Sequence, residues 1–267
     1  AHVYGAGHSE TVVGKAVKEI GRDKVVLTTK VGIWYEPDGV YNEATKCLKC
    51  NERVVMTQIE ESLKRLQTDY LDFYQVHYAG TTPIEESTAA MQKLVMQGKI
   101  RHWGISNYSY DQIEKVISLG YVCSYQPQYS LLYRENQKSI DLCAKNNIGI
   151  LTYGSIAGGI LSGKYRTEED CPKDGRTQTY PFYHGEAFKK AMKLVDVLEM
   201  IANDHQKPIS HVAINWVNQQ PGITTSLVGM KTPEQAISNA EAGNWELSKE
   251  ELMLINSTYE KLFGDQQ

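Results

Sequence analysis

Short apolar runs alternate with amphipathic segments along this 267-residue chain, and that alternation limits its fold more than any other feature. The apolar runs have the length of strands, and between them apolar residues recur at helical spacing. Such a pattern is typical of repeated βα units around a parallel sheet, hence of an α/β fold. We predict strands at residues 24–31, 71–77, 102–107, 124–129, 149–154 and 225–230.

Capping boxes mark the starts of several of the intervening helices. In this motif a Ser or Thr side chain accepts from the amide three residues on, where Glu or Gln reaches back. The matching pairs are Thr57 with Glu60, Ser109 with Gln112, Thr232 with Gln235 and Ser248 with Glu251. We therefore expect amphipathic helices over 57–66 and 109–119, each packing its apolar face on a sheet.

Two stretches, 32–55 and 164–186, are irregular enough to be expected as long loops, which are usually functional or mobile. No linker or change of composition divides the chain, so we predict a single domain over 1–267. Cys47 and Cys50 form a lone C-x-x-C, weak evidence for zinc, and we interpret them as free thiols without a metal.

Composition excludes several classes of protein. Twenty-eight Lys and Arg against 32 Asp and Glu give a net charge of −4 without a long basic block, so nucleic acid is not an expected partner. The most apolar stretch, residues 148–161, is shorter than the roughly 20 residues of a membrane span. Five cysteines in a chain of this length favour a reducing, cytoplasmic compartment.

Four of the predicted strands end at or beside a residue with a reactive or polar side chain: Lys30, His77, Asn107 and Tyr153. The C-terminal ends of parallel strands in a βα barrel meet at one rim, where active sites of that fold lie. Each residue also has a structural interpretation, as a solvated lysine, a core histidine, a helix cap or one of 17 tyrosines. Together they predict a site at the strand ends.

Several segments resemble those of aldo-keto reductases, in the expected order and spacing. They are the opening "AHVYGAGHSE" from its third letter, "TTK", "YQVH", "WGISN", "LTYGSIAGGILSGKY" and "LVGMKTPEQAISNAEA". The resemblance implies a (β/α)8 TIM barrel, here lacking its first two strands and first helix, which we expect before Ala1. It covers essentially the whole chain.

The resemblance implies that Tyr4, Lys30 and His77 are catalytic, with an aspartate expected five residues before Tyr4. The implied activity is NADPH-dependent reduction of aldehydes and ketones to alcohols by hydride transfer, with Tyr4 as proton donor. A phenol is a reluctant proton donor near neutral pH, and a neighbouring ammonium lowers its pKa. Lys30 would supply that charge, and His77 would help to polarise the carbonyl oxygen.

The resemblance also implies the residues that hold NADP. They are Ser106, Asn107, Gln126, Tyr153, Gly154, Ser155, Ile156, Gly158, Leu161, Lys164, Gly229, Lys231, Thr232, Gln235 and Asn239. Many relatives have Ser-Pro where this chain has Gly154 and Ser155. Lys231 precedes a predicted helix start, where free amides and the helix dipole favour an anion. The resemblance implies that this region holds the adenosine 2′-phosphate, which favours NADP over NAD.

Alternatives remain at this stage. Gly5 and Gly7 could begin a dinucleotide fingerprint, although Glu10 replaces its third glycine, or simply form a turn before a helix capped by Ser9. The chain could instead oxidise a sugar or alcohol with NAD or NADP, or serve as a channel-type regulatory subunit with slow turnover.

Substrate residues are harder to predict than the others. We expect Trp34 and Tyr35 to contact a small carbonyl or alcohol substrate, with Tyr180, Phe182 and Tyr183 as further aromatic candidates. Membrane insertion is not expected, and a homo-oligomer is possible. The sequence identifies neither the physiological substrate nor the preferred direction of the reaction.

Overall fold

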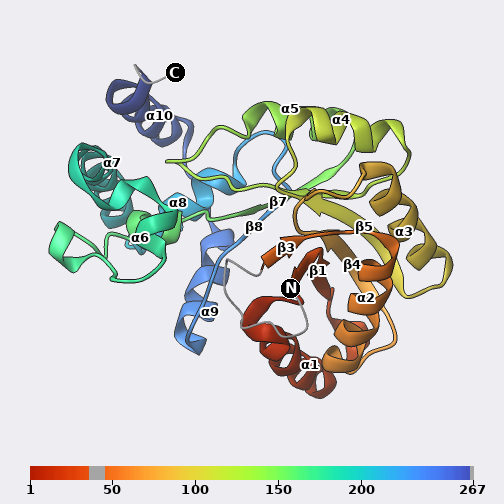
Figure 1. Ribbon diagram of the computed structural model, residues 1–267. Helices are drawn as coiled ribbons and strands as arrows, with labels where there is room; N and C mark the ends of the chain where they lie inside the picture. Colours follow the sequence, from red (N-terminus) through yellow and green to blue (C-terminus); the bar gives the residue numbers. More distant parts are fainter. Residues whose placement is uncertain (36–45, 265–267) are drawn as a thin grey trace. The chain divides into compact units, whose positions relative to one another are not determined.

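The structure is a computed structural model that describes residues 1–35 and 46–264. It contains two compact units. The first is Ala1–Pro127 with Leu142–Gly149, and the second is Gln128–Asp141 with Ile150–Gln267. Strands and helices alternate along the chain in both units (Figure 1), as an α/β fold requires. The single domain over 1–267 stays a prediction.

A parallel sheet forms the centre of the first unit. Its strands, in spatial order, are β1 (Thr28–Val31), β4 (Leu71–Val76), β5 (Ile100–Ser106) and β6 (Ser124–Gln126). All three pairings are parallel, so the C-terminal ends of these strands lie along one edge of the sheet. The bulky side chains of Tyr74, Trp103 and Tyr125 are buried in this unit.

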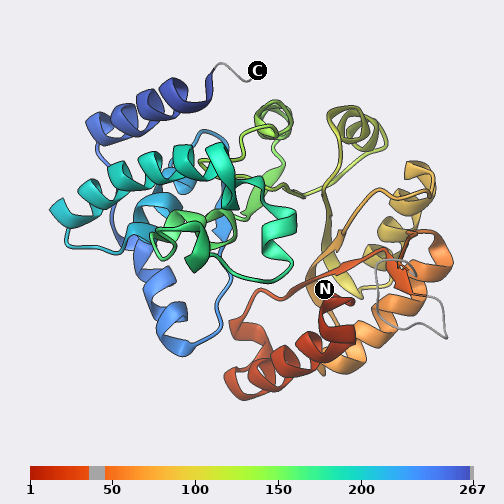
Figure 2. The same ribbon diagram turned by 60° about the vertical axis from the view of Figure 1, so that its left-hand side comes forward.

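Helices cover the outer side of that sheet in Figure 1: α1 (His8–Ile20), α2 (Glu52–Leu66), α3 (Ile84–Met96) and α4 (Tyr110–Ser118). As expected, α2 buries Ile59, Leu63 and Leu66. Figure 2 shows α1 lying beside α2. A Cβ on Gly14 would lie 2.5 Å from the Arg65 carbonyl oxygen, so glycine permits this close approach.

A small antiparallel hairpin corrects the loop expected over 32–55. Strand β2 (Ile33–Tyr35) pairs with β3 (Lys46–Leu48), and α2 begins within the same stretch. Residues 36–45 of the expected loop lie outside the described residues. Cys50 is a buried free thiol, whereas nothing is described of the Cys47 side chain.

The second unit has its own parallel pair, β7 (Gly149–Tyr153) and β8 (Thr225–Leu227). Its helices are α6 (Arg176–Thr179), α7 (Gly185–Asp204), α8 (Ile209–Asn218), α9 (Pro233–Glu241) and α10 (Lys249–Phe263), while α5 (Gln137–Lys145) runs from this unit into the first. Buried residues of α7 and α8 form its core. The expected loop 164–186 contains α6 and two short 3₁₀ turns, which corrects that prediction in part.

All of the predicted strands occur in the structure. Some of the predicted helix caps are present and others are not. Capping boxes are present at Ser109 and Ser248. The Thr232 side chain accepts from the Gln235 amide, although the Gln235 side chain accepts from the Lys231 amide instead of reaching back to Thr232. The predictions at Thr57 and Ser9 were wrong. Thr57 lies inside α2, which Asn51 caps, and Ser9 lies inside α1, which follows Gly7.

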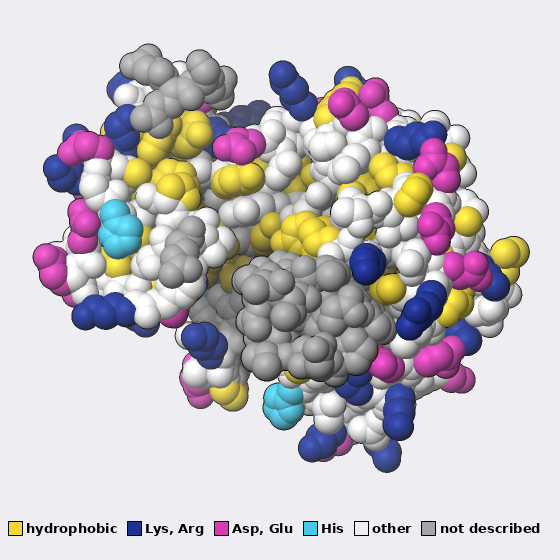
Figure 3. Space-filling view, viewed as in Figure 1, with side chains coloured by type: hydrophobic (Ala, Val, Ile, Leu, Met, Phe, Trp, Pro, Cys, Tyr) yellow, Lys and Arg dark blue, Asp and Glu magenta, His cyan; other side chains and the backbone are white. Residues whose placement is uncertain are grey.

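Charged side chains of both signs are interspersed on the face drawn in Figure 3. This distribution agrees with the nearly balanced composition of 28 basic and 32 acidic residues. Across residues 1–35 and 46–264, none of the helices combines the length and the apolar character needed to cross a membrane.

Candidate active site

Tyr4 begins a tight turn, Tyr4–Gly7, that leads directly into α1; we call it the Tyr4 turn. Gly5, Ala6 and Gly7 all have positive φ, at 58°, 51° and 90°. For alanine this left-handed conformation is strained, and it persists only where the surroundings hold it. The turn leaves Tyr4 44% exposed, so its phenol is accessible from solvent.

Lys30 lies on β1, and its ammonium nitrogen is 5.4 Å from the centre of the Tyr4 ring. Burial lowers the pKa of Lys30 from 10.5 to about 8, because desolvation disfavours the charged form. The backbone also links the two segments, since the His2 amide donates to the Lys30 carbonyl at 3.2 Å. The site thus holds an ammonium, made easier to deprotonate, beside a phenol.

His77 follows β4 and is 8% exposed. Its ring lies edge to face with Tyr4, with the ring centres 5.7 Å apart, and stacks on Tyr78 with the ring centres 5.0 Å apart. The His77 amide donates to the carbonyl of Val31 at 2.8 Å, which fixes its place beside β1. A phenol, an ammonium and an imidazole therefore converge at the C-terminal ends of the strands of the first unit.

A chain of hydrogen bonds extends from His77 into the sheet. The side-chain nitrogen of Asn107, Nδ2, donates to the backbone carbonyl of His77 at 3.0 Å and to Ser106 Oγ at 3.1 Å. Ser106 Oγ donates to the Gln126 carbonyl at 2.7 Å. Asn107 has a φ of 57°, which asparagine tolerates better than most residues. Three of the residues predicted to hold NADP thus lie in one network beside His77.

Gln75 belongs to the same network and was missed from the sequence. It is fully buried, and its side-chain oxygen accepts from the Gln126 side-chain amide at 2.9 Å. Its own amide donates to Ser124 Oγ at 3.2 Å. The sequence feature that could have indicated this network is a glutamine inside the apolar run "LDFYQVH". A buried side-chain amide needs hydrogen-bond partners.

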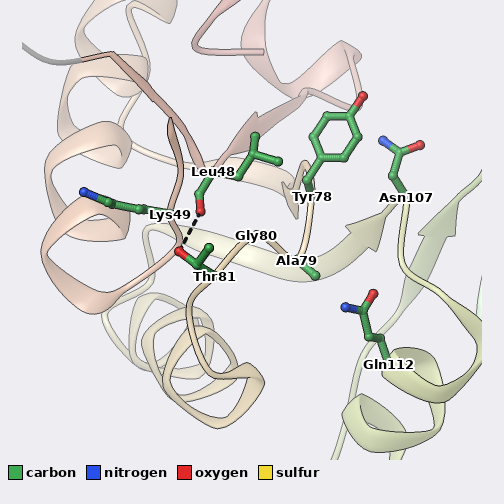
Figure 4. A pocket seen from close by; sticks show the side chains of 8 residues that line it. All are labelled: Leu48, Lys49, Tyr78, Ala79, Gly80, Thr81, Asn107 and Gln112. Atoms are coloured by element: carbon green, nitrogen blue, oxygen red, sulfur yellow. Dashed lines mark hydrogen bonds between the residues drawn. The ribbon is translucent and has the colours of Figure 1, made fainter. Parts of the chain in front are cut away.

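A pocket of about 660 Å³ opens beside this network in the first unit. Its lining residues are Leu48, Lys49, Tyr78, Ala79, Gly80, Thr81, Asn107 and Gln112 (Figure 4). Tyr78 and Asn107 stand on one side of it, near His77, and Leu48 and Lys49 come from the end of the hairpin. Asn107 thus belongs both to the wall of this pocket and to the hydrogen-bond network beside His77.

The predicted substrate residues Trp34 and Tyr35 form part of β2, at the hairpin whose other strand leads to the pocket. Their side chains lie outside the described residues. Contact between either aromatic ring and a substrate stays a prediction.

In the second unit, the segment after β7 is rich in residues with a left-handed backbone. Positive φ occurs at Gly154, Ala157, Gly158, Gly159 and Gly163. Ser155 is 1% exposed, and its hydroxyl has no hydrogen-bond partner among the described residues. An unpaired buried hydroxyl beside a glycine-rich turn is the feature of this segment that would fit the pyrophosphate of a dinucleotide.

Tyrosines of segment 164–186 pack against that loop. Tyr183 is fully buried and its hydroxyl donates to the Gly158 carbonyl at 2.9 Å. A Cβ on Gly158 would lie 2.8 Å from two ring carbons of Tyr180, so only glycine fits there. Tyr183 therefore supports the loop and does not line an open pocket, while Phe182 packs edge to face on Phe263.

The remaining predicted cofactor residues also belong to the second unit. Thr232 caps α9, Pro233 occupies its first position, and Lys231 and Gln235 are exposed beside them. Asn239 Nδ2 donates to the Gly229 carbonyl at 3.4 Å. Leu161 is buried, Ile156 is partly buried and Lys164 is exposed. Tyr153 ends β7 in this unit, so its predicted meeting with Lys30 and His77 stays a prediction.

Comparison with known proteins gives a consistent result. The model of the aldo/keto reductase family matches residues 1–260. The chain is 36% identical over 269 residues to the aldo-keto reductase YhdN of Bacillus subtilis (strain 168), across 99% of this chain and 80% of that protein. It is 30% identical over 271 residues to an NADH-specific methylglyoxal reductase of Escherichia coli (strain K12), across 97% and 82%.

Solved structures of the same kind superpose on the chain. The glycerol dehydrogenase AKR11B4 from Gluconobacter oxydans gives a TM-score of 0.90 at 29% identity, over 98% of this chain and 80% of that one. An aldo-keto reductase from Klebsiella pneumoniae in complex with NADPH gives 0.75 at 28% identity, over 97% and 78%.

Proposed function

The chain belongs to the aldo/keto reductase family, and from that premise we propose that it reduces aldehydes or ketones to alcohols with NADPH, using Tyr4 as the proton donor. The family consists of oxidoreductases that act on carbonyl groups, so the chain is an enzyme of that type. The observation that carries the finer proposal is the meeting of Tyr4, Lys30 and His77 at the strand ends of the first unit.

Each of the three residues has a role that its position supports. Negative charge grows on the carbonyl oxygen as the carbon is reduced, and Tyr4 would give its phenolic proton to that oxygen. The Lys30 ammonium, 5.4 Å from the Tyr4 ring, would favour loss of that proton. His77, edge to face with Tyr4, would donate a second hydrogen bond to the oxygen and so orient the carbonyl.

The residues that would hold the cofactor lie in the network beside His77, in the loop after β7 and at the start of α9. NADPH, when bound, would supply the hydride that the carbonyl carbon receives. Ser106, Asn107 and Gln126 would hold its carboxamide, and the loop after β7, with the unpaired Ser155 hydroxyl, would hold its pyrophosphate. At α9, the positive end of the helix dipole and Lys231 would bind the 2′-phosphate, which favours NADPH over NADH.

Replacement of Tyr4 tests this function. Tyr4→Phe keeps the ring and removes the proton, so we expect kcat for a simple aldehyde to fall about 100-fold to 10,000-fold, the usual size of general acid catalysis. Nicotinamide fluorescence, titrated in the same preparation, should give an unchanged Kd for NADPH and a weaker one for NADH. An unaltered rate in Tyr4→Phe would remove the proton-donor role, and tighter binding of NADH would reverse the cofactor preference.

The reverse reaction is the second candidate. It is favoured by the high structural similarity to a glycerol dehydrogenase, TM-score 0.90. The same three residues would then act in the opposite sense, with Tyr4 accepting the proton of an alcohol. Comparing kcat/KM for an aldehyde with NADPH and for its alcohol with NADP⁺ decides between the two directions.

A further inference from the structure

A buried carboxylate that the proposed chemistry does not use lies in the first turn of the helix that follows the Tyr4 turn. Glu10, in the first turn of α1, is 2% exposed. It accepts hydrogen bonds from Thr29 Oγ1 at 2.6 Å, Ser62 Oγ at 2.9 Å and Arg65 Nε at 2.7 Å. A buried charge is costly unless it is paired and hydrogen-bonded, and here one carboxylate joins α1, β1 and α2.

The first of these contacts reaches the strand that carries the ammonium. Thr29 is 3% exposed and immediately precedes Lys30 on β1. Successive side chains of a strand point to opposite faces, so Thr29 faces the helices while Lys30 faces away from them. The hydrogen bond from Thr29 to Glu10 therefore holds the stretch of β1 from which Lys30 projects.

The ion pair with Arg65 reaches the turn that carries the phenol. A Cβ built on Gly7 would lie 2.8 Å from both Cδ and Nε of Arg65, so the arginine side chain packs directly against the backbone of that glycine. Gly7 ends the Tyr4 turn and has a φ of 90°. Arg65 is held in place by Glu10 on one side and by Glu61, at 3.7 Å, on the other.

The Tyr4 turn needs such support, because Ala6 within it has a left-handed backbone that alanine does not prefer. Glu10 belongs to the helix that continues this turn, and its partner Arg65 packs against Gly7 at the end of the turn.

We propose that Glu10 and Arg65 are positioning residues, which hold the Tyr4 turn and the Lys30 strand in register so that phenol and ammonium remain adjacent. This inference rests on the proposed function, in which those two groups act together. A displacement of about 1 Å between reacting groups is enough to slow an enzyme roughly 100-fold.

Glu10→Gln is the direct test, since it preserves the shape and the acceptor for Thr29 while removing the charge that holds Arg65. We expect kcat for aldehyde reduction to fall about 10-fold to 100-fold, with KM and the Kd for NADPH within about twofold of the original values. Circular dichroism at the assay temperature confirms that the variant is folded.

Asp72→Asn is the matched control. Asp72 is also buried in the first unit and accepts from two arginines, Arg22 at 2.8 Å and Arg101 at 3.0 Å, but it lies at the start of β4, away from the Tyr4 turn. It should lower the melting temperature without altering kcat in the folded state. An equal loss of kcat in both variants would show a general effect of instability and overturn the inference.

Combination with Tyr4→Phe separates positioning from stability. If Glu10 acts through Tyr4, adding Glu10→Gln to Tyr4→Phe leaves the residual rate unchanged, whereas a general structural defect lowers it further. A Tyr4→Phe variant with full activity would contradict the proposed function itself. Full activity in Glu10→Gln, with Tyr4→Phe inactive, would contradict only the positioning role.

A second variant covers the case in which Glu10→Gln does not fold. Glu10→Gln with Arg65→Met removes both charges together, and buried ion pairs replaced in this way often retain stability. We expect this double variant to fold and to keep a reduced kcat, because the support of Gly7 is altered. A kcat equal to that of the original chain would overturn the inference.

Discussion

Lys30 has opposite effects on stability and on the proposed chemistry. Burial disfavours its ammonium and lowers its pKa to about 8, so keeping it charged at neutral pH costs folding free energy. The same ammonium, 5.4 Å from the Tyr4 ring, is the group that would promote proton transfer. A residue that destabilises its fold and contacts another reactive side chain is typical of a functional site.

Titration of Lys30 should therefore appear in the activity. As pH rises through about 8, the ammonium loses its proton, so we expect kcat/KM for aldehyde reduction to decline above that pH. Lys30→Met should abolish this decline and lower the rate at pH 7 by at least about 100-fold, as removal of a preorganised charge does. Rates between pH 6 and 10 check both expectations.

The stability of Lys30→Met tests the direction of the Lys30 pKa shift. Because the folded pKa of about 8 lies below 10.5, the unfolded chain binds more protons between those values, and stability rises with pH across that window. Lys30→Met removes that dependence and should melt at a higher temperature at pH 7. Lys24→Met, at an exposed lysine, is the control for the loss of one positive charge. If the decline of kcat/KM above a pH of about 8 persists in Lys30→Met, that decline comes from a group other than Lys30.

Among the helices, α9 and α10 both begin at a hydroxyl cap and allow a comparison, although only α10 has the full capping box. Thr232 caps α9 by accepting from the Gln235 amide, and Ser248 caps α10 by accepting from the Glu251 amide. Only α9 begins beside Lys231, where we place the 2′-phosphate. The cap holds the first turn of α9, and with it the positive end of the helix dipole beside Lys231.

Removing each cap tests that assignment. Thr232→Ala and Ser248→Ala should each lower the free energy of unfolding by about 1 kcal/mol. Thr232→Ala should also raise the Kd for NADPH several-fold, whereas Ser248→Ala should leave it unchanged. Fluorescence titration and urea denaturation measure the two quantities; equal effects of both variants on NADPH binding would place the phosphate elsewhere.

At the scale of the whole molecule, acid stability depends on a cluster at the start of β4. Burial raises the pKa of Asp72, but hydrogen bonds from the Leu27 amide and Arg22, with the charges of Arg22 and Arg101, outweigh it and hold that pKa below 3.8. A depressed carboxyl pKa contributes stability above the unfolded value, and this contribution is lost as pH falls through the folded value.

Asp72→Asn should therefore lower the melting temperature at pH 7, and the difference from the original chain should shrink as pH falls below about 4. Calorimetry at pH 7, 5, 4 and 3 measures that difference. A difference that stays constant over this range would show that the ion pairs of Asp72 do not supply the stability.

Part of the candidate site was predictable from the sequence, and the failures have physical causes. Lys30, His77 and Asn107 were placed correctly at strand ends, because parallel strands end at one edge whatever their order. Gln75 was missed because its amide is satisfied by residues 49 and 51 positions away. The cap at Thr57 was wrong because its signal also occurs inside a helix that Asn51 starts earlier.

By itself the sequence determined the alternation of strands and helices and the boxes at Ser109 and Ser248, because these depend on spacing among near neighbours. It also indicated the family, through motifs that follow one another in order along the chain. Only the tertiary structure decided what surrounds Glu10, whose partners lie 19, 52 and 55 residues away along the chain. A buried charge is stable only where distant segments bring it donors, and no local pattern records which segments those will be.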